Sequence, residues 1–341
     1  MEKKLLIIYS VFGKSLFIKK QINECLENLR SLFWHIDQNN LDNEVRVVVS
    51  ANCSPDYLLN SIKKEFKNRI TIFHYTARTT CQIAFNKTCM FAEEYFDEKY
   101  LGFCSMTSGV KFKKQKDLFP RAIAKLSTNE YGMIAFQADN DHNYNYLGYL
   151  DNYRENIDFS KDYQIPIGCL TIGHCQIFHK DLKEFYGKPW CDVFGRGNQE
   201  SSYSYVCAAL RKKYILMGDS EVHEESANDN QNTPYSLLDM QKYPWPNKWY
   251  VGLMFGRTFE KTFLADKEGI DAGLGWHCEK TKEIYIEHGV MPLEYLIDPK
   301  HDKYDENYLS LDERLKYSVK RNYFSTIEEI NYDKIKVDVV N

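Results

Sequence analysis

The chain has 341 residues and a formal net charge of −4 at pH 7. Hydrophobic residues make up 43% of it and aromatic residues 15%, which suffices for a sizeable core and excludes a disordered chain. The weakly acidic balance gives no overall attraction for nucleic acid. The length allows one large domain, or one domain with an appendage.

The cysteines and the N-terminus bear on the cellular compartment. The ten cysteines contain no C-x-x-C pair and no spacing typical of a zinc module. Cys104, Cys169 and Cys207 lie in apolar runs, where a free cysteine behaves as a small hydrophobic residue. The first apolar run, Leu5–Tyr9, is too short for a signal peptide, and no run is long enough to span a membrane. We therefore expect a reduced, cytoplasmic protein.

Apolar runs alternate with helical patterns from the N-terminus to residue 137. The expected buried strands are Leu5–Val11, Val45–Val49, Ile70–His74, Tyr100–Met106 and Tyr131–Gln137. The expected helices are Ser15–Asp37, one that starts at Ser54-Pro55, Ile83–Phe96 and about Leu118–Ser127. Five alternations of strand and helix favour an α/β fold with a doubly wound, mostly parallel sheet.

The remaining chain is less regular. Ile167–Phe178 returns to strand character. The polar run Ser226–Thr233 marks a boundary or a mobile lid. We divide the chain there into residues 1–225 and a mixed α/β C-terminal extension, residues 226–341. The extension ends in a candidate edge strand, Ile335–Val340.

The segment 194–225 carries the candidate chemistry. It combines a glycine-containing loop, a helix capped by Asn198 and a short strand, Tyr214–Met217. This order puts Glu200 and His223 at neighbouring ends of adjacent elements. A carboxylate beside a polar loop suits a general base that takes the proton of an attacking hydroxyl. The alternatives are that Glu200 is a first-turn acid favoured by the helix dipole, and that His223 is a surface or hydrogen-bonded histidine.

In this order of elements the first 225 residues, about two-thirds of the chain, resemble a GT-A-fold, nucleotide-sugar-dependent glycosyltransferase of the inverting family 2 type. The polar loop Ser50-Ala51-Asn52 stands where that family holds the nucleobase. Arg78 and the run Ala84-Phe85-Asn86-Lys87 are similar to its next donor-binding element. Gln199-Glu200 and His223 are similar to its later region, in which an acidic helix start precedes a histidine.

The resemblance implies a hexosyl- or pentosyltransferase with Glu200 as catalytic base. Residues 1–225 would be the catalytic domain and residues 226–341 an acceptor-binding or packing extension. The donor, a UDP-sugar above others, would be held by a set of polar and small residues: Ser10, Ser50, Asn52, Arg78, Asn86, Thr107, Ser108 and Gly109. The acceptor would be a surface glycan or a lipid-linked sugar. Two alternatives stay open: a phage-type glycosyltransferase acting on hydroxylated DNA bases, and a GT-A-like binding protein without catalysis.

The metal-binding D-x-D motif of the family is absent. The strand Leu101–Ser105 is followed by Met106-Thr107-Ser108-Gly109-Val110, which contains no carboxylate. A leaving diphosphate gains negative charge, which such enzymes neutralise with Mn²⁺ or Mg²⁺ held by carboxylate oxygens, or with Lys or Arg. The basic candidates by position are Arg78, Lys111 and Arg196.

A divalent metal nevertheless stays open. Asp139-Asn140-Asp141 spells D-x-D one strand later than the family places it, where a solvated turn is the better explanation. His223 is the candidate metal ligand that the resemblance retains.

Overall fold

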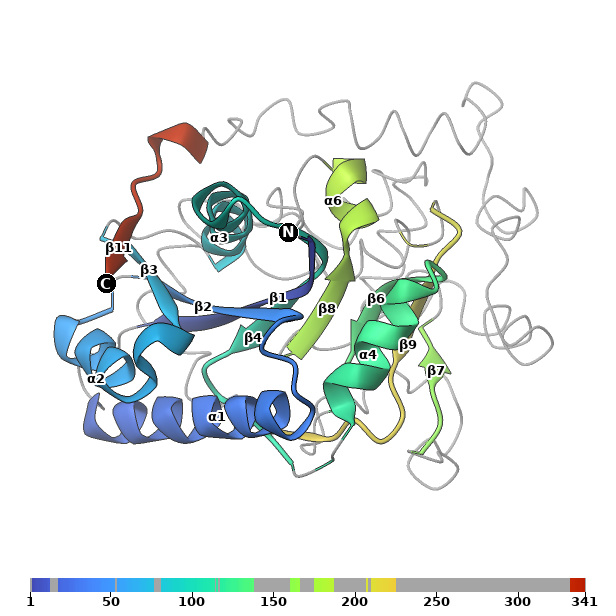
Figure 1. The fold of residues 1–341 in the computed structure, drawn as a ribbon, viewed down its shortest axis with the longest axis horizontal. Coiled ribbons are helices and arrows are strands. Elements are labelled where there is room, and N and C mark those ends of the chain that lie inside the picture. The colour runs from blue at the N-terminus through green and yellow to red at the C-terminus, as the bar shows by residue number, and fades with distance from the viewer. Residues whose placement is uncertain are drawn as a thin grey trace, which may run out of the picture.

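The computed structural model describes residues 2–12, 18–52, 54–76, 81–113, 115, 117–137, 160–165, 175–186, 207, 210–224 and 332–340. Its centre is a mixed sheet with the strand order β11-β3-β2-β1-β4-β8-β6-β9-β7 (Figure 1). The strands of this sheet are β1 Glu2–Phe12, β2 Val45–Asn52, β3 Thr71–Tyr75, β4 Lys99–Thr107, β6 Tyr131–Ala135, β7 Tyr163–Gln164, β8 Cys175–His179, β9 Lys213–Leu216 and β11 Asp338–Val340. A separate ribbon pairs β5 (Val110–Phe112) with β10 (Val222–Glu224).

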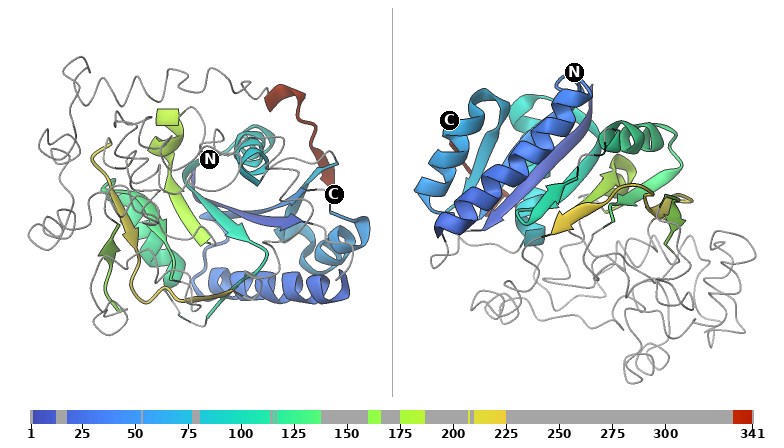
Figure 2. Two further views of the ribbon diagram at one scale, coloured as in Figure 1. Left: turned by 180° about the vertical axis from the view of Figure 1, so that it is seen from behind. Right: turned by 90° about the horizontal axis from the view of Figure 1, so that it is seen from below.

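Helices connect these strands and cover both faces of the sheet. They are α1 Ile18–Gln38, α2 Asp56–Phe66, α3 Cys81–Phe96, α4 Leu118–Ser127 and α6 Lys180–Tyr186, with short 3₁₀ turns η1 at Lys67–Arg69 and η5 at Tyr332–Lys334. α1, α2 and α4 lie on one face, and α3 and α6 lie on the other (Figures 1 and 2). The predicted α/β class with five strand–helix alternations is confirmed.

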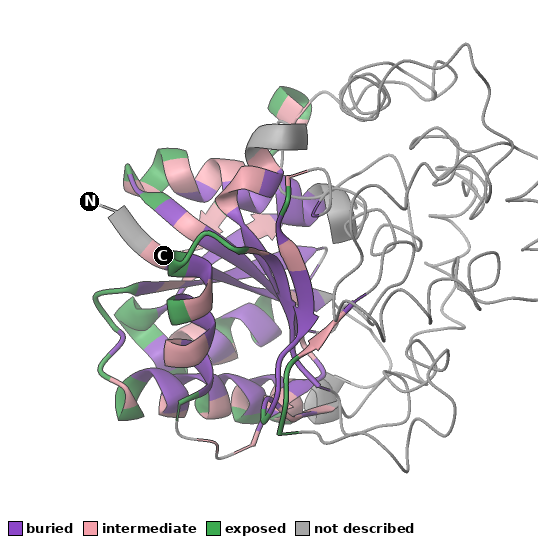
Figure 3. Ribbon diagram, turned by 90° about the vertical axis from the view of Figure 1, so that its right-hand side faces the viewer, coloured by how far each residue is buried: buried purple, intermediate pink, exposed green. Residues whose placement is uncertain are grey.

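The first four strands form a parallel unit whose strand centres are apolar on both sides. Leu5 to Tyr9 of β1 are each 0% exposed, as expected for a strand with helices above and below (Figure 3). The expected parallel pattern has an exception beyond β4. There β8 is inserted antiparallel between β4 and β6, so the strand beginning at Tyr131 does not neighbour β4.

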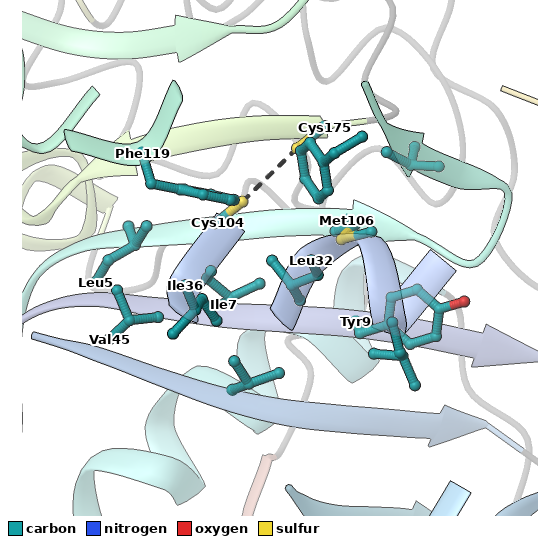
Figure 4. Packing of buried hydrophobic residues seen from close by; sticks show 14 of the residues in the cluster. Leu5, Ile7, Tyr9, Leu32, Ile36, Val45, Cys104, Met106, Phe119 and Cys175 are labelled. Carbon is teal, nitrogen blue, oxygen red and sulfur yellow. Dashed lines mark hydrogen bonds between the residues drawn. The ribbon is translucent and has the colours of Figure 1, made fainter. Parts of the chain in front are cut away.

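Alternation along a strand decides which helices each side chain meets. On β2, Val47 and Val49 belong to the core beneath α1 and α2, so Val48, Ser50 and Asn52 face α3. Figure 4 shows the packing of the apolar core on the α1 face.

Cysteines contribute to this core as expected. Cys104 of β4 and Cys175 of β8 are buried free thiols whose Sγ atoms lie 3.8 Å apart (Figure 4). Burial raises the pKa of the Cys175 thiol, so its sulfur remains a protonated packing group at neutral pH. Cys207 is also buried and free, and Cys169 lies outside the described residues.

The C-terminal residues return to the sheet. β11 pairs antiparallel with β3 at the edge, which confirms an edge strand within Ile335–Val340. The division of the chain at residue 225 stays a prediction, since residues 225–331 lie outside the described part. Within the described residues, no helix has both the length and the apolar character that crossing a bilayer requires.

Candidate functional site

The strand order creates a switch point between β1 and β4. From β1 the chain proceeds to β2 and β3 on one side, then returns to β4 on the other side of β1. The helices that follow β1 and β2 lie on one face of the sheet, and α3, which follows β3, lies on the opposite face. In open α/β sheets, ligands bind outside the carboxyl ends of the strands at such a point. The carboxyl ends of β1 and β4 therefore mark the candidate site.

Three hydroxyl side chains meet at this end of the sheet. Ser10 of β1 is in register with Thr107 of β4 on one side and with Ser50 of β2 on the other. Their neighbours Tyr9 and Val11 belong to the core on the α1 face, so Ser10 faces the α3 side. We call Thr107, Ser10 and Ser50 the polar row. Asn52 continues the same face two residues beyond Ser50, which brings together four of the predicted donor-binding residues.

Ser50 is tied to α3 by buried hydroxyls. Thr88 Oγ1 donates to Ser50 Oγ at 3.0 Å and lies 2.6 Å from Tyr75 Oη, and Tyr75 Oη donates to the Ala84 carbonyl at 3.0 Å. Ser50 is 2% exposed and Thr88 0%. Burial raises the pKa of Tyr75, which keeps its phenol a hydrogen-bond donor. Sequence reasoning missed Tyr75 and Thr88, because nothing local distinguishes a hydroxyl that joins a helix to a strand from one that faces water.

Asn86 lies on α3 two residues from Ala84 and two from Thr88, but its contact is to the far end of the chain. Its side chain is 0% exposed, and Nδ2 donates to Tyr332 Oη at 3.0 Å. The predicted donor-binding amide therefore already binds a residue of η5. Sequence reasoning gave Tyr332 no role, since the two residues are 246 positions apart.

The turn Thr107-Ser108-Gly109 connects β4 to β5 where the family would carry its D-x-D. The Ser108 carbonyl oxygen accepts hydrogen bonds from Tyr9 Oη at 3.0 Å and from Asn28 Nδ2 at 2.6 Å. Thr107 Oγ1 is buried and makes no hydrogen bond with any described residue. A buried hydroxyl without a partner is uncommon, and this one can donate a hydrogen bond to a ligand.

The ribbon of β5 and β10 begins directly after this turn. His223 of β10 lies opposite Lys111 of β5, and cross-strand partners share a face. Val110 and Phe112 are buried, so Lys111 faces the other way, and its Nζ lies 3.2 Å from Glu27 Oε2 in an exposed ion pair. The structure thus places two predicted candidates, His223 and Lys111, beside each other.

The described residues do not fit a divalent metal. They contain no group of three or more His, Cys, Asp or Glu side chains that converge on one point. At the place of the D-x-D they offer the Thr107 hydroxyl and Gly109, whereas Mn²⁺ and Mg²⁺ favour carboxylate oxygens. We therefore derive no chemical step through a metal. Other predicted site residues lie outside the described part: Glu200, Arg78, Arg196, Asp139 and Asp141.

Comparison with known proteins bears on the fold. No protein-family model matches the chain, and no curated protein sequence matches it. A mannosyltransferase from Pyrobaculum calidifontis, solved with GDP-Man and Mn²⁺, aligns with a TM-score of 0.53 and 14% identity over 87% of this chain and 79% of its own. GalNAc-T7, solved with UDP, GalNAc and Mn²⁺, aligns with a TM-score of 0.53 and 10% identity over 86% of this chain but only 56% of its own. At such identities the likeness concerns architecture alone, and that architecture confirms the expected resemblance: the chain has the GT-A fold found in nucleotide-sugar glycosyltransferases.

Proposed function

We propose that the protein is an inverting glycosyltransferase that moves a sugar from a nucleoside-diphosphate donor to an acceptor hydroxyl. The observation that supports this most is the polar row at the switch point of a GT-A fold. Small hydroxyl side chains at strand ends leave room for a ligand and provide hydrogen bonds to it. The neighbouring folds were solved with GDP-Man or with UDP, which supports a nucleotide-sugar donor.

In this proposal Asn52, Ser10 and Thr107 bind the donor, and Lys111 acts on its leaving group. Asn52, the last residue of β2, contacts the nucleobase, while Ser10 and Thr107 donate hydrogen bonds to the diphosphate. Lys111 provides positive charge as the bond from the anomeric carbon to the phosphate oxygen breaks. Its ion pair with Glu27 is exposed on both sides, and such pairs contribute only about 0–1 kcal/mol, so Lys111 can leave Glu27 at little cost.

The acceptor side of the reaction rests on Glu200. As general base it takes the proton of the acceptor hydroxyl while that oxygen attacks the anomeric carbon from the face opposite the diphosphate. We assign the acceptor to surface glycans or lipid-linked sugars, and its selection to residues 226–341.

Replacing Glu200 tests this assignment. Glu200→Gln keeps the shape of the side chain but cannot accept a proton, so kcat should fall by roughly 10²–10⁴-fold with donor affinity nearly unchanged. Single-turnover kinetics and calorimetry measure the two quantities. Glu221→Gln is the matched control, because Glu221 is not a residue of the polar row and forms an ion pair with Lys113, with 2.6 Å between Oε1 and Nζ. An active Glu200→Gln protein that is only destabilised, by up to about 1 kcal/mol, would identify Glu200 as a first-turn acid.

A non-catalytic GT-A-like binding protein is the second candidate. The observation that favours it is the absence of carboxylates at the Thr107–Gly109 turn. A panel of UDP-, GDP-, ADP- and dTDP-sugars, with and without Mn²⁺, separates the two by thermal shift and by release of the nucleoside diphosphate. Binding with slow donor hydrolysis supports the enzyme, and binding without any turnover, even with glycan acceptors, supports the binding protein. No shift with any nucleotide contradicts both.

A further inference from the structure

One side of α1 binds the backbone of the turn that follows β4. Asn28, Ser31 and His35 are spaced by three and four residues, so they share a face of the helix. We call them the α1 ladder. Asn28 and His35 are both 0% exposed although they are polar. Buried polar residues in a row on one helix face indicate a specific partner rather than general packing.

That partner is the main chain from Ser108 to Lys113. Asn28 Nδ2 donates to the Ser108 carbonyl at 2.6 Å, and Ser31 Oγ accepts the Phe112 N–H at 3.0 Å. His35 Nε2 lies 2.7 Å from the Lys113 carbonyl and donates to it, since a carbonyl only accepts. Burial lowers the pKa of His35, so the ring is neutral at pH 7. The helix therefore holds the turn and β5 at three successive points.

Ser108 is held most firmly, because Tyr9 Oη donates to the same carbonyl at 3.0 Å. Tyr9 is 0% exposed, and burial raises the pKa of its phenol, which keeps the proton on the oxygen. Asn28 and Tyr9 thus fix the direction of the Ser108 carbonyl, toward α1. In a trans peptide the C=O and the following N–H point in opposite directions. The N–H of Gly109 therefore points away from α1.

The polar row faces the same side. Thr107 is in register with Ser10, whose side chain faces away from α1, and Thr107 Oγ1 is the buried hydroxyl without a partner among the described residues. The Gly109 N–H and the Thr107 hydroxyl, two residues apart, are thus both directed toward the α3 side at the switch point. Backbone N–H groups held in this way bind anions, because they carry fixed partial positive charge.

We propose that Asn28 is a positioning residue that aims the Ser108–Gly109 peptide at the diphosphate of the donor. The inference rests on the proposed function, since it assumes a nucleoside-diphosphate ligand. Asn28 itself touches no ligand and acts through Ser108. A turn aimed by a buried amide gives hydrogen bonds to the phosphates where the family's carboxylates would hold a metal.

Calorimetric titration of the full-length protein with UDP and with GDP, with and without Mn²⁺, tests the proposal. Asn28→Ala should weaken the affinity for the better nucleotide by about tenfold, the worth of one well-made hydrogen bond. Tyr9→Phe removes the other donor to Ser108 and should weaken affinity by about three- to tenfold. Ser31→Ala is the matched control. It removes the hydrogen bond from the Phe112 N–H of β5 to Ser31 Oγ, which lies beyond the turn. The affinity for the nucleotide should stay within twofold of the wild-type value.

A comparison of ligands with and without phosphate distinguishes the loss of a positioned Gly109 N–H from a general loss of structure in Asn28→Ala. Titration with uridine or guanosine, followed by NMR, should give the same affinity for wild type and Asn28→Ala, since nucleosides carry no phosphate. Equal UDP or GDP affinity in wild type, Asn28→Ala and Tyr9→Phe overturns the proposal while leaving the proposed function intact. Loss of nucleoside binding in Asn28→Ala overturns it too. If Asn28→Ala does not fold, Tyr9→Phe carries the same test. A wild-type protein that binds neither nucleotide overturns the proposed function and this inference together.

Discussion

Thr107 shows how a single residue changes what a strand end can bind. A carboxylate in its place would need a cation to balance its charge, whereas a hydroxyl is neutral and donates one hydrogen bond. The Thr107 hydroxyl is buried and has no partner among the described residues, so the free protein bears a desolvation cost that a bound ligand can remove.

Thr107→Val tests whether the Thr107 hydroxyl binds a ligand rather than a group of the protein. Valine has nearly the same shape but no polar atom, so removing an unpaired buried hydroxyl should leave the free energy of unfolding unchanged or slightly higher. If the hydroxyl binds the donor, nucleotide affinity should fall by about 5- to 30-fold. Denaturant unfolding and calorimetry measure the two effects on one protein. A clear loss of stability with unchanged affinity would show that the hydroxyl has a structural partner instead.

Some individual residues of the candidate site could be predicted from the sequence. Ser10, Ser50, Asn52 and Thr107 lie together because they stand at or near the carboxyl ends of neighbouring parallel strands, and strand ends are visible in the sequence. Asn28 could not be found in this way. Its polar side chain lies on a helix that looks ordinarily amphipathic, and its partner is a carbonyl of a turn 80 residues away.

Among the elements, the junction of β8, α6 and β9 carries a buried polar cluster away from the polar row. His179 Nδ1 accepts the Asp181 N–H at 3.2 Å and so caps α6. Lys212 Nζ lies 2.8 Å from Asp181 Oδ2 and 2.5 Å from Asn129 Oδ1. Desolvation lowers the pKa of His179 to about 4, partly opposed by the nearby Asp181 charge. The ring is therefore neutral at pH 7, as its acceptor role requires.

This cluster predicts a loss of stability in mild acid. The folded-state pKa of His179 is about 4 and the unfolded value is about 6.5, so protons favour the unfolded chain as pH falls from about 6.5 toward 4. Between pH 7 and 5 the His179 contribution to stability should decrease by about 2 kcal/mol. Urea unfolding of wild type and His179→Gln across that range measures it. Glutamine does not titrate, so its stability should depend less on pH; parallel curves would contradict the assigned pKa.

The elements themselves were predictable to different degrees. Apart from the short strand β5, which was not predicted, the α-helices and strands up to residue 137 follow from apolar periodicity, because each pattern has its own period. The direction of β8 could not be predicted. A strand buried on both faces has the same apolar composition whichever way it runs, and its neighbours β4 and β6 are set by contacts far along the chain.

At the scale of the whole molecule, the C-terminal residues complete the α3 side of the sheet. η5 brings Tyr332 to Asn86, and β11 places Val339 beside Phe73 at the edge of β3. Both contacts join residues 332–340 to elements that begin the fold. β10, which ends at Glu224, pairs with β5, and η5, which begins at Tyr332, contacts α3.

Tyr332→Phe measures how much the hydrogen bond between Asn86 and Tyr332 contributes to stability. The change removes the oxygen that accepts from Asn86 Nδ2, so the free energy of unfolding should fall by about 1–2 kcal/mol. Amide hydrogen exchange should rise in α3 more than in α1. Tyr57→Phe is the matched control, because Tyr57 is 43% exposed, and it should change stability by less than about 0.5 kcal/mol. Equal effects of the two changes would show that the Asn86 contact contributes little.

The position of β11 also has a consequence for synthesis of the chain on the ribosome. β3 lies between β2 and β11, and its outer edge pairs with residues 338–340. While the chain is being translated, β1 to β4 can assemble long before residue 338 emerges, and during that interval the backbone groups of the β3 edge are open. Open strand edges pair readily with other chains. We expect nascent chains stalled before residue 332 to need chaperone protection at this edge, and released full-length chains to lose that need.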